Sequence, residues 1–421
     1  MQKFGRYAAI FFTILLCGYA LLYLAGLIPQ ASVLKNVQLS AGQLSAEGYG
    51  TQLLVRNDET YQLDNYTETR ILLSSLYMDT QKTPQAVLIN PTYEGDNVPI
   101  EAIEAVAEEG KTIPADTYHA EKVMGFRAIV RILLSMMNIR QIRRLIMWCV
   151  ILLIALNALT LRRQFSALIA VLFTVSILCV NPVVIMSSIQ YSCCFLIALC
   201  ATLVMPYADR LKKLTAGMLF FILGAVTQFL DYYTVPVITF ALPMLVLMLT
   251  KQRDGKYLRF SEAVGFSAKC FANWLGAYAL VWLTKLAMTD LFTDFSAFPA
   301  AFDGLLHAVT PRAFGEPFRA AWACIRNTVT IESAVCVLVF VVLWPFLLDL
   351  RPARSQGFRE SGIYLVLAAV PLLWAMATCR AVLGNAYYQY RLMAACIFGV
   401  CCFYAKPTHS LEKFREPARA R

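Results

Sequence analysis

Charged residues are scarce in this sequence, at 15% of its 421 residues, whereas 59% of the residues are hydrophobic. Soluble chains carry about 25% charged residues, so the composition argues against an ordinary water-soluble protein. Histidine is rarer still, with only His119, His307 and His409, which excludes a histidine-rich metal site. The motifs of P-loop NTPases, dinucleotide-binding domains, zinc proteases and serine hydrolases are also missing. A nucleotide-driven pump and a soluble-type hydrolase are therefore disfavoured.

Disulfide bonds are not expected. The sequence has thirteen cysteines, but none lies between residues 29 and 143, the stretch predicted below to face the outside. A disulfide framework is thus excluded in the compartment where oxidation could form one. The cysteines that are present lie in or near apolar runs, which is typical of small core residues.

Long apolar runs are abundant. Each is about as long as a helix needs to cross the roughly 30 Å hydrocarbon layer, and in lipid such runs must be helical because every backbone amide has to bond within its own segment. The runs cover residues 7–28, 145–161, 165–184, 189–205, 214–230, 234–249, 263–286, 331–348, 363–383 and 392–404. Only Asp231, Tyr232 and Tyr233 separate the fifth run from the sixth, and Pro236 and Pro243 could mark a kinked or re-entrant segment instead.

These runs predict an α-helical polytopic membrane protein with about ten transmembrane helices; nine or eleven are the alternatives. The first run follows two basic residues, as in a signal peptide, but it exceeds the usual apolar stretch of about 7–15 residues. We therefore expect a retained anchor.

Basic residues predict the orientation of the chain. Lys and Arg cluster in every second loop and in the C-terminal tail, whereas the short turns near Pro182, Asp231 and Asn385 contain none. This positive-inside pattern places both termini in the cytoplasm and the protein in the cell membrane. It also accounts for much of the net charge of +10, so nucleic-acid binding is not needed to explain that charge.

The chain divides into four predicted parts. Residues 1–28 form the first transmembrane helix. Residues 29–143 form a small mixed α/β extracytoplasmic domain, with strands at 51–56 and 86–89, helices at 65–77 and around 100–106, and an amphipathic interfacial helix at 126–137. Residues 144–405 form the helix bundle, in which an outer loop at 290–330 carries a similar amphipathic stretch at 318–328. Residues 406–421 form a basic cytoplasmic tail.

Polar side chains at the predicted outer surface are the candidate site. Asp64 or Asp231 could act as the base that takes a proton from an acceptor alcohol, while Arg127 and Arg131 could clamp a phosphate. Structural roles are the alternatives: Asp64 precedes a predicted helix and could cap it, Asp231 could be a turn residue facing water, and the arginines could contact phospholipid headgroups.

Four further residues on the same side complete the predicted substrate-binding set: His119, Gln190, Tyr390 and Arg391. An aromatic belt at the membrane boundary would explain Tyr390 without function, but an arginine at the depth of Arg391 needs a partner. No cofactor is required by the sequence. A divalent metal is possible at Asp231, but no other feature points to one.

Several segments together resemble a group of bacterial polytopic proteins allied to the GT-C superfamily of membrane glycosyltransferases. They are residues 28–40, 62–67, 125–140, 188–192, 227–236 and 390–391, in this order along nearly the whole chain. The resemblance implies a sugar donor on polyprenyl phosphate and inverting transfer outside the membrane. It also implies that an acidic residue of the first outer loop activates the acceptor. That role maps onto Asp64, with Asp231 in reserve, and Arg131 and Arg391 would hold the lipid phosphate.

The sequence thus predicts a GT-C-like glycosyltransferase that moves a sugar from a polyprenyl-phosphate donor to a cell-envelope glycan or lipid. Its expected partners are membrane lipids, that donor and that acceptor, and no nucleic acid. Two other classes stay open: a non-enzymatic transporter or flippase of envelope precursors, and a membrane assembly or scaffold protein.

Overall fold

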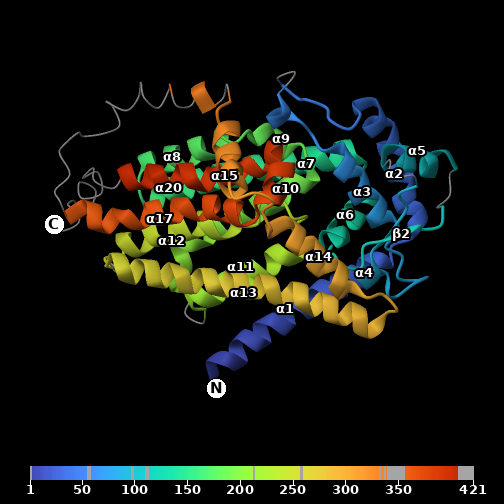
Figure 1. Ribbon diagram of the computed structural model, residues 1–421, viewed down its shortest axis with the longest axis horizontal. Helices are drawn as coiled ribbons and strands as arrows, with labels where there is room; N and C mark the ends of the chain where they lie inside the picture. The colour runs from blue at the N-terminus through green and yellow to red at the C-terminus, as the bar shows by residue number, and fades with distance from the viewer. Residues whose placement is uncertain are drawn as a thin grey trace, which may run out of the picture.

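The computed structural model describes residues 2–54, 58–95, 99–109, 113–211, 214–256, 259–330, 333–335, 338 and 356–405. These residues are predominantly helical, and their only sheet is one antiparallel pair of two-residue strands. Helices of the bundle run side by side along the long axis of the molecule, and the segment between α1 and α7 packs on one end of it (Figure 1).

The N-terminal part consists of short helices around α1 and α3. Its elements are α1 (Gln2–Gly26), α2 (Gln30–Glu47), η1 (Glu59–Tyr61), α3 (Asn65–Leu76), α4 (Ala86–Ile89), β1 (Pro91–Thr92), α5 (Pro99–Glu109), β2 (Thr117–Tyr118) and α6 (Phe126–Leu134). The helices predicted at 65–77, 100–106 and 126–137 are confirmed as α3, α5 and α6. Each shows apolar residues at helical spacing, which is the most reliable local signal in a sequence.

The strands predicted in this part are not found among its described residues. Residues 86–89 form α4, which ends at Asn90 in the left-handed region with a φ of 49°. A four-residue apolar run fits a buried helical turn as well as a strand, so the pattern alone could not decide. In the described part of 51–56, Gln52 makes only an isolated bridge to Gln62. The described region is therefore mainly helical rather than mixed α/β.

The remainder of the described chain is a bundle of helices. Its elements are α7 (Ile139–Gln164), α8 (Ala167–Leu178), α9 (Pro182–Met186), α10 (Ile189–Val204), η2 (Met205–Arg210), α11 (Ala216–Leu230), α12 (Ile238–Arg253), α13 (Phe260–Phe292), α14 (Ala297–Val309), α15 (Glu316–Asn327), α17 (Gln356–Ala377), α18 (Cys379–Gly384), α19 (Ala386–Gln389), η3 (Tyr390–Leu392) and α20 (Met393–Ala405).

Four helical segments of the described chain are long and apolar enough to cross a membrane: Phe4–Gly26, Ile139–Gln164, Ile189–Arg210 and Phe260–Phe292. Shorter apolar helices accompany them at Ala167–Leu178, Ala216–Leu230, Ala297–Val309 and Ser361–Ala377. The structure is therefore compatible with a membrane protein. The predicted run at 331–348 lies largely outside the described residues, and the predicted tail at 406–421 lies wholly outside them.

The predicted span at 165–184 is not one helix. The chain breaks between α8 and α9 at Asn181, which has a φ of 54° and is followed by Pro182. The 12 residues of α8 rise only about 18 Å at 1.5 Å per residue, which is less than the roughly 30 Å of a hydrocarbon core. The sequence indicated a turn near Pro182, but the hydropathy of the run alone did not show that the helix ends before it, because hydropathy does not register backbone conformation.

Polar caps mark where several bundle helices begin. The hydroxyls of Ser166, Ser188 and Thr215 accept hydrogen bonds from the amides three residues later, at the starts of α8, α10 and α11. Asn138 and Gln141 form a reciprocal capping box at the start of α7. Such caps satisfy first-turn amides that would otherwise lack partners, which contributes about 1 kcal/mol each.

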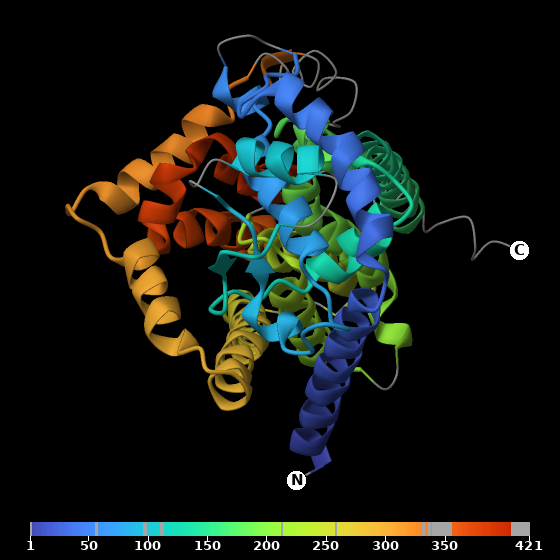
Figure 2. The same cartoon turned by 90° about the vertical axis from the view of Figure 1, so that its right-hand side faces the viewer.

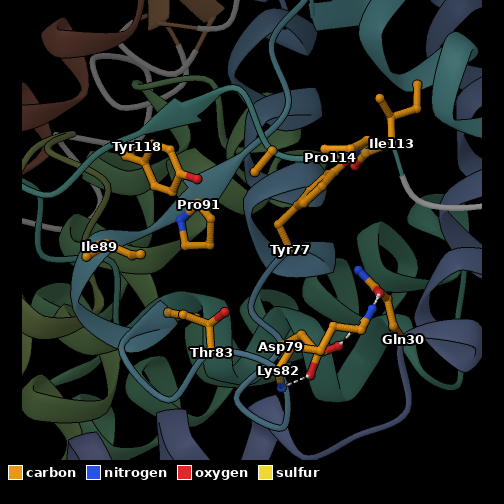
Figure 3. A pocket seen from close by; sticks show the side chains of 12 residues that line it. Gln30, Tyr77, Asp79, Lys82, Thr83, Ile89, Pro91, Ile113, Pro114 and Tyr118 are labelled. Carbon is orange, nitrogen blue, oxygen red and sulfur yellow. Dashed lines mark hydrogen bonds and ion pairs between the residues drawn. The ribbon is translucent and has the colours of Figure 1, made fainter.

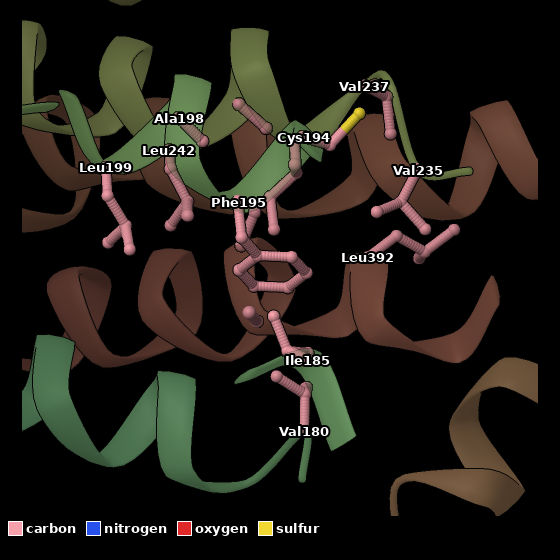
Figure 4. Packing of buried hydrophobic residues seen from close by; sticks show 14 of the residues in the cluster. Val180, Ile185, Cys194, Phe195, Ala198, Leu199, Val235, Val237, Leu242 and Leu392 are labelled. Carbon is pink, nitrogen blue, oxygen red and sulfur yellow. The ribbon is translucent and has the colours of Figure 1, made fainter. Parts of the chain in front are cut away.

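Within the described residues, one extensive hydrophobic cluster runs from α2 and α3 through the bundle to α20, and three smaller clusters are separate from it. Figure 4 shows the centre of the extensive cluster, where Phe195 of α10 packs among Ile185, Val235 and Leu392. Close helix contact is possible at Gly224, because a Cβ atom there would lie 2.0 Å from a backbone oxygen of α13. The N-terminal part therefore shares its core with the bundle that positions the site.

Candidate functional site

One polar cavity lies where the N-terminal part meets the bundle. Its volume is about 290 Å³, near the lower end of the roughly 300–1,000 Å³ of ligand pockets. Its walls come from five segments far apart in sequence: Asp64, Thr67, Lys122, Gln190, Tyr232, Tyr233, Ala381, Asn385, Tyr388 and Gln389. We call it the Asp64 cavity. Hydroxyl, amide, carboxylate and ammonium groups line it, so it suits a small polar group.

Asp64 lies in the wall of this cavity and also caps α3. One carboxylate oxygen accepts a hydrogen bond from the Thr67 amide at 2.9 Å, and the other accepts one from the Thr67 hydroxyl at 2.6 Å. The predicted structural role is thus present. The Asp64 side chain is also hydrogen-bonded to Tyr387, and because a carboxylate has about four acceptor positions, one remains for a ligand in the cavity.

Gln190 is held in the cavity wall by a buried acid, Glu68. The Glu68 carboxylate accepts a hydrogen bond from the Ser188 hydroxyl at 2.8 Å and one from the backbone amide of Gln190 at 3.1 Å. It lies 3.7 Å from Nε of Arg143. Burial raises the pKa of Glu68, although the positive charge of Arg143 opposes this. The side-chain oxygen of Gln190 is buried with no hydrogen-bond partner, so it is available to a donor in the cavity.

Arg391 lies behind the cavity with part of its hydrogen-bonding capacity unused. Its guanidinium group stacks on the rings of Tyr191 and Tyr390, at 4.6 and 5.2 Å from their centroids, and donates one bond of 3.0 Å to the Thr60 carbonyl. Nε and Nη1 are buried without a hydrogen-bond partner. Burying such donors without partners is costly, which points to an acceptor supplied from elsewhere.

Asp64 and Arg391 both act on the same tyrosine. Burial raises the pKa of Tyr387, the negative charge of Asp64 raises it further, and the positive charge of Arg391 opposes this. Tyr191 also stacks with Tyr388, whose ring lines the cavity, at a centroid distance of 5.2 Å. The predicted residues Asp64, Gln190, Tyr390 and Arg391 therefore belong to one neighbourhood.

Asp231 is placed differently from the expectation of an open outer turn. It is only 2% exposed, and its two carboxylate oxygens accept bonds of 2.9 and 2.6 Å from the amide and hydroxyl of Thr234. Burial raises its pKa, and the bonds to Thr234 oppose the shift. Its neighbours Tyr232 and Tyr233 line the cavity. Asp231 shapes this turn rather than facing the cavity, so the water-facing turn expected for it is wrong.

Arg127 and Arg131 point into the protein, with no exposed surface. Arg131 donates to four carbonyls, those of Ala25, Ile28, Ser75 and Leu76, at 2.7–3.0 Å. Arg127 donates to carbonyl oxygens of Ser74, Ala86 and Met124 and to the Asn90 side chain. Burial lowers the pKa of Arg127 to about 9 and that of Arg131 to about 10, so both stay charged at neutral pH. Each arginine makes four bonds within the protein with its five N–H donors, and both side chains are buried, so this structure does not present them to a phosphate.

The expected orientation of α6 is therefore reversed. Its arginine side faces the core, while Ile129, Ile132 and Met136 are exposed. The amphipathic pattern showed that the two sides differ, but it could not show which side lies inward. A guanidinium group has five N–H donors, so a single arginine can bind several carbonyls at the ends of α1 and α3 at once.

His119 lies in an ion-pair cluster beside the cavity. Its Nε2 is 2.8 Å from the Glu94 carboxylate, which also pairs with Arg70 at 2.6 Å. The neighbouring Lys122 lines the cavity, and burial lowers its pKa. His119 thus pairs with Glu94 and does not line the cavity. Lys122, Asn385 and Gln389 were not predicted, because no motif surrounds them and only the fold brings them together.

A second cavity, of about 270 Å³, lies on another side of the N-terminal part (Figure 3). Tyr77, Pro91 and Tyr118 form much of its wall. Its one ammonium group, on Lys82, is already bonded to Gln30 at 3.0 Å and lies 3.6 Å from Asp79. No residue of the predicted site lines it. Within the described chain, no three His, Cys, Asp or Glu residues are grouped to hold a metal ion.

Comparison of the chain with known protein families, curated proteins and solved structures found no match in any of the three. The resemblance to GT-C enzymes therefore stays a prediction, and function has to be argued from the Asp64 cavity.

Proposed function

We propose that this protein is a multi-pass membrane glycosyltransferase, with both termini in the cytoplasm, that uses a lipid-phosphate sugar donor at the outer face. The observation that carries the proposal is the Asp64 cavity, where a carboxylate, amide side chains and tyrosines from distant segments surround one small space. A sugar ring offers hydroxyl groups to such carboxylates and amides and an apolar face to aromatic rings.

The proposed reaction needs one base and one anion-binding group. Asp64 takes the proton of the acceptor hydroxyl while the oxygen of that hydroxyl forms a bond to the anomeric carbon of the sugar. The bond between that carbon and the phosphate oxygen breaks, and the lipid phosphate leaves with the electron pair. Arg391 is the proposed anion-binding group because two of its donors have no partner in the protein, and since it lies behind the cavity wall, the tyrosines there have to shift for the departing phosphate to reach it.

An apolar groove gives the lipid chain of the donor a place. It lies between α10 and α11, measures about 420 Å³ and is lined almost wholly by apolar surface, including Leu196, Ile197 and Val226. Gln190, Ile197 and Ala201 are spaced by seven and four residues and so lie on one side of α10. The groove thus continues from the side of the helix that meets the cavity.

The decisive experiment replaces the base without removing the helix cap. Asparagine caps helices as well as aspartate does, so Asp64→Asn keeps the bond from the Thr67 amide and loses the base. Asp58→Asn is the matched control, because Asp58 accepts bonds of 2.9 and 2.7 Å from the amide and hydroxyl of Thr60 in the same part of the fold. It does not line the cavity.

Transfer of labelled sugar from polyprenyl phosphate to envelope extract is measured with purified protein in lipid discs. We expect Asp64→Asn to lower the rate by about 10²–10⁴-fold, the usual contribution of a general base, and Asp58→Asn to leave it unchanged. Two negative results together would refute the proposal: no sugar transfer by the purified wild-type protein, and no change in the envelope glycan of cells from which the protein is deleted. Equal rates for the wild type and Asp64→Asn would remove Asp64 from it.

A further inference from the structure

The outward side of α15 carries large apolar side chains. Phe314, just before the helix, is 92% exposed, and Phe318 and Trp322 are 60% and 64% exposed. Ile325 and Val329 continue the same stripe. At 3.6 residues per turn, Phe318, Trp322 and Ile325 fall within roughly 60° of one another, and Phe314 and Val329 flank the two ends of the helix. We call these five residues the α15 stripe.

The inward side of α15 is built from small residues. Ala320 and Cys324 are fully buried, where α15 packs on α17, α18, α19 and η3. The Asn327 side chain donates a 3.0 Å hydrogen bond to the Ala386 carbonyl of α19. A helix on a water-facing surface buries its large apolar residues and exposes its small or polar ones. The reversed order in α15 requires an apolar environment outside it.

The direction and charge of α15 specify that environment. In Figure 1, α15 runs across the direction of α17 and α13. In Figure 2, which looks along the bundle, α15 lies in the plane of the picture. Arg319 and Arg326 are exposed and, seven residues apart, follow one edge of the stripe. A helix with an apolar side bordered by arginines, lying crosswise to spanning helices, suits the boundary between lipid headgroups and acyl chains.

The helix that precedes this segment is long enough to pass beyond a hydrocarbon core. The 33 residues of α13 extend about 50 Å at 1.5 Å per residue, which exceeds a hydrocarbon core of about 30 Å. Its last residues, Leu291 and Phe292, are exposed and lead into the segment that contains α15. The segment that contains the α15 stripe thus follows a helix that has the composition of a membrane span.

We propose that the α15 stripe is a lipid-contact surface, embedded in the headgroup–acyl boundary with Arg319 and Arg326 on the phosphates. The inward side of α15 supports α18, α19 and η3, which supply Asn385 and Gln389 to the Asp64 cavity and also carry Arg391. Bound phospholipid therefore holds that wall of the cavity in place. This role is independent of the transferase chemistry.

Fluorescence of Trp322 tests the proposal. The full-length protein and its Trp322→Phe variant are placed in lipid discs, and the difference between their emission spectra isolates Trp322. We expect this component to be quenched at least twofold by lipids brominated near the glycerol end of the acyl chain, and less by lipids brominated near the chain terminus. Trp148 of α7, which is similarly exposed on a candidate span, is the control. The difference between the spectra of the wild type and the Trp148→Phe variant isolates Trp148, and we expect both kinds of brominated lipid to quench it.

Two results would overturn the proposal. If aqueous acrylamide quenches the Trp322 component and brominated lipid does not, the stripe faces water. If neither quenches it, another protein or a second copy of the chain covers the stripe. Trp322→Phe preserves the apolar surface, so the variant is expected to fold, and an unchanged far-ultraviolet circular dichroism spectrum checks this.

Discussion

Replacing Arg131 by alanine should detach α6 from the ends of α1 and α3. The guanidinium group donates to two carbonyls at the end of α1, Ala25 and Ile28, and to two at the end of α3, Ser75 and Leu76. Helix C-termini leave carbonyls without partners in the helix, and Arg131 binds three carbonyls at such ends and that of Ile28, two residues after α1. Alanine cannot reach any of them.

The magnitude follows from these four bonds. A hydrogen bond to a charged group contributes about 1.5–3 kcal/mol net, so four contribute about 6 kcal/mol even at the low end. Water entering the space left by the side chain would rehydrate some of the carbonyls, and we expect a net loss of about 3–6 kcal/mol. Domains are stable by only about 5–15 kcal/mol, so local opening of this region should become easy to measure.

Hydrogen exchange of the backbone amides measures that opening. A loss of 3–6 kcal/mol corresponds to about 10²–10⁴-fold faster exchange in α3 and α6. Arg140→Ala is the matched control, because Arg140 is exposed in the first turn of α7, and it should change the opening free energy by less than about 0.5 kcal/mol. Less than tenfold acceleration in Arg131→Ala would refute the assigned role of these bonds.

Two further predictions concern packing and pH. Gly224→Ala should lower the free energy of unfolding by about 1–3 kcal/mol, because the new methyl group meets the Trp274 carbonyl. Gly276→Ala, with open space around it, should be neutral or stabilising. Melting temperatures of the two variants in the same detergent test this difference. Burial opposes the charge of Glu94, but the hydrogen bond from His119 and a nearby guanidinium outweigh it and lower the pKa of Glu94. The stabilisation that the ionised Glu94 contributes is therefore complete above its ordinary pKa of 4.5 and is lost as the pH falls through the lower pKa of the folded protein. The Glu94→Gln variant should not show this loss of stability in an acid-unfolding titration.

Helix positions were the part of the fold that the sequence pattern predicted well. Apolar runs and N-cap residues are local signals, and α3, α10 and α11 begin at Asp64, Ser188 and Thr215. The break at Asn181 and the short helix at 86–89 were missed, because backbone conformation and tertiary packing decide them. Local pattern cannot weigh such long-range terms.

The candidate site was predictable only in part. Asp64 and Gln190 were selected from the sequence and line the cavity, but Lys122 was not, since nothing local distinguishes it from a solvated lysine. Glu68 was also missed, although it follows Asp64 by one helical turn and therefore shares its side of α3. A buried acid that fixes the amides of another helix has no signature in its own segment.

Helices α6 and α15 both direct large apolar side chains outward, and in α6 this orientation is why its arginines misled the prediction. In α6 the arginines bind carbonyls in the core and Ile132 faces outward; in α15 the small residues face the core and Trp322 faces outward. Helix α6 packs on α3, which begins at Asp64, and α15 packs on the segment that includes Gln389. The two sides of the Asp64 cavity are thus each supported by a helix with an apolar outer surface. If both surfaces lie in the same lipid boundary, the cavity between them opens at the depth of the phosphate groups, where a lipid-linked sugar is presented.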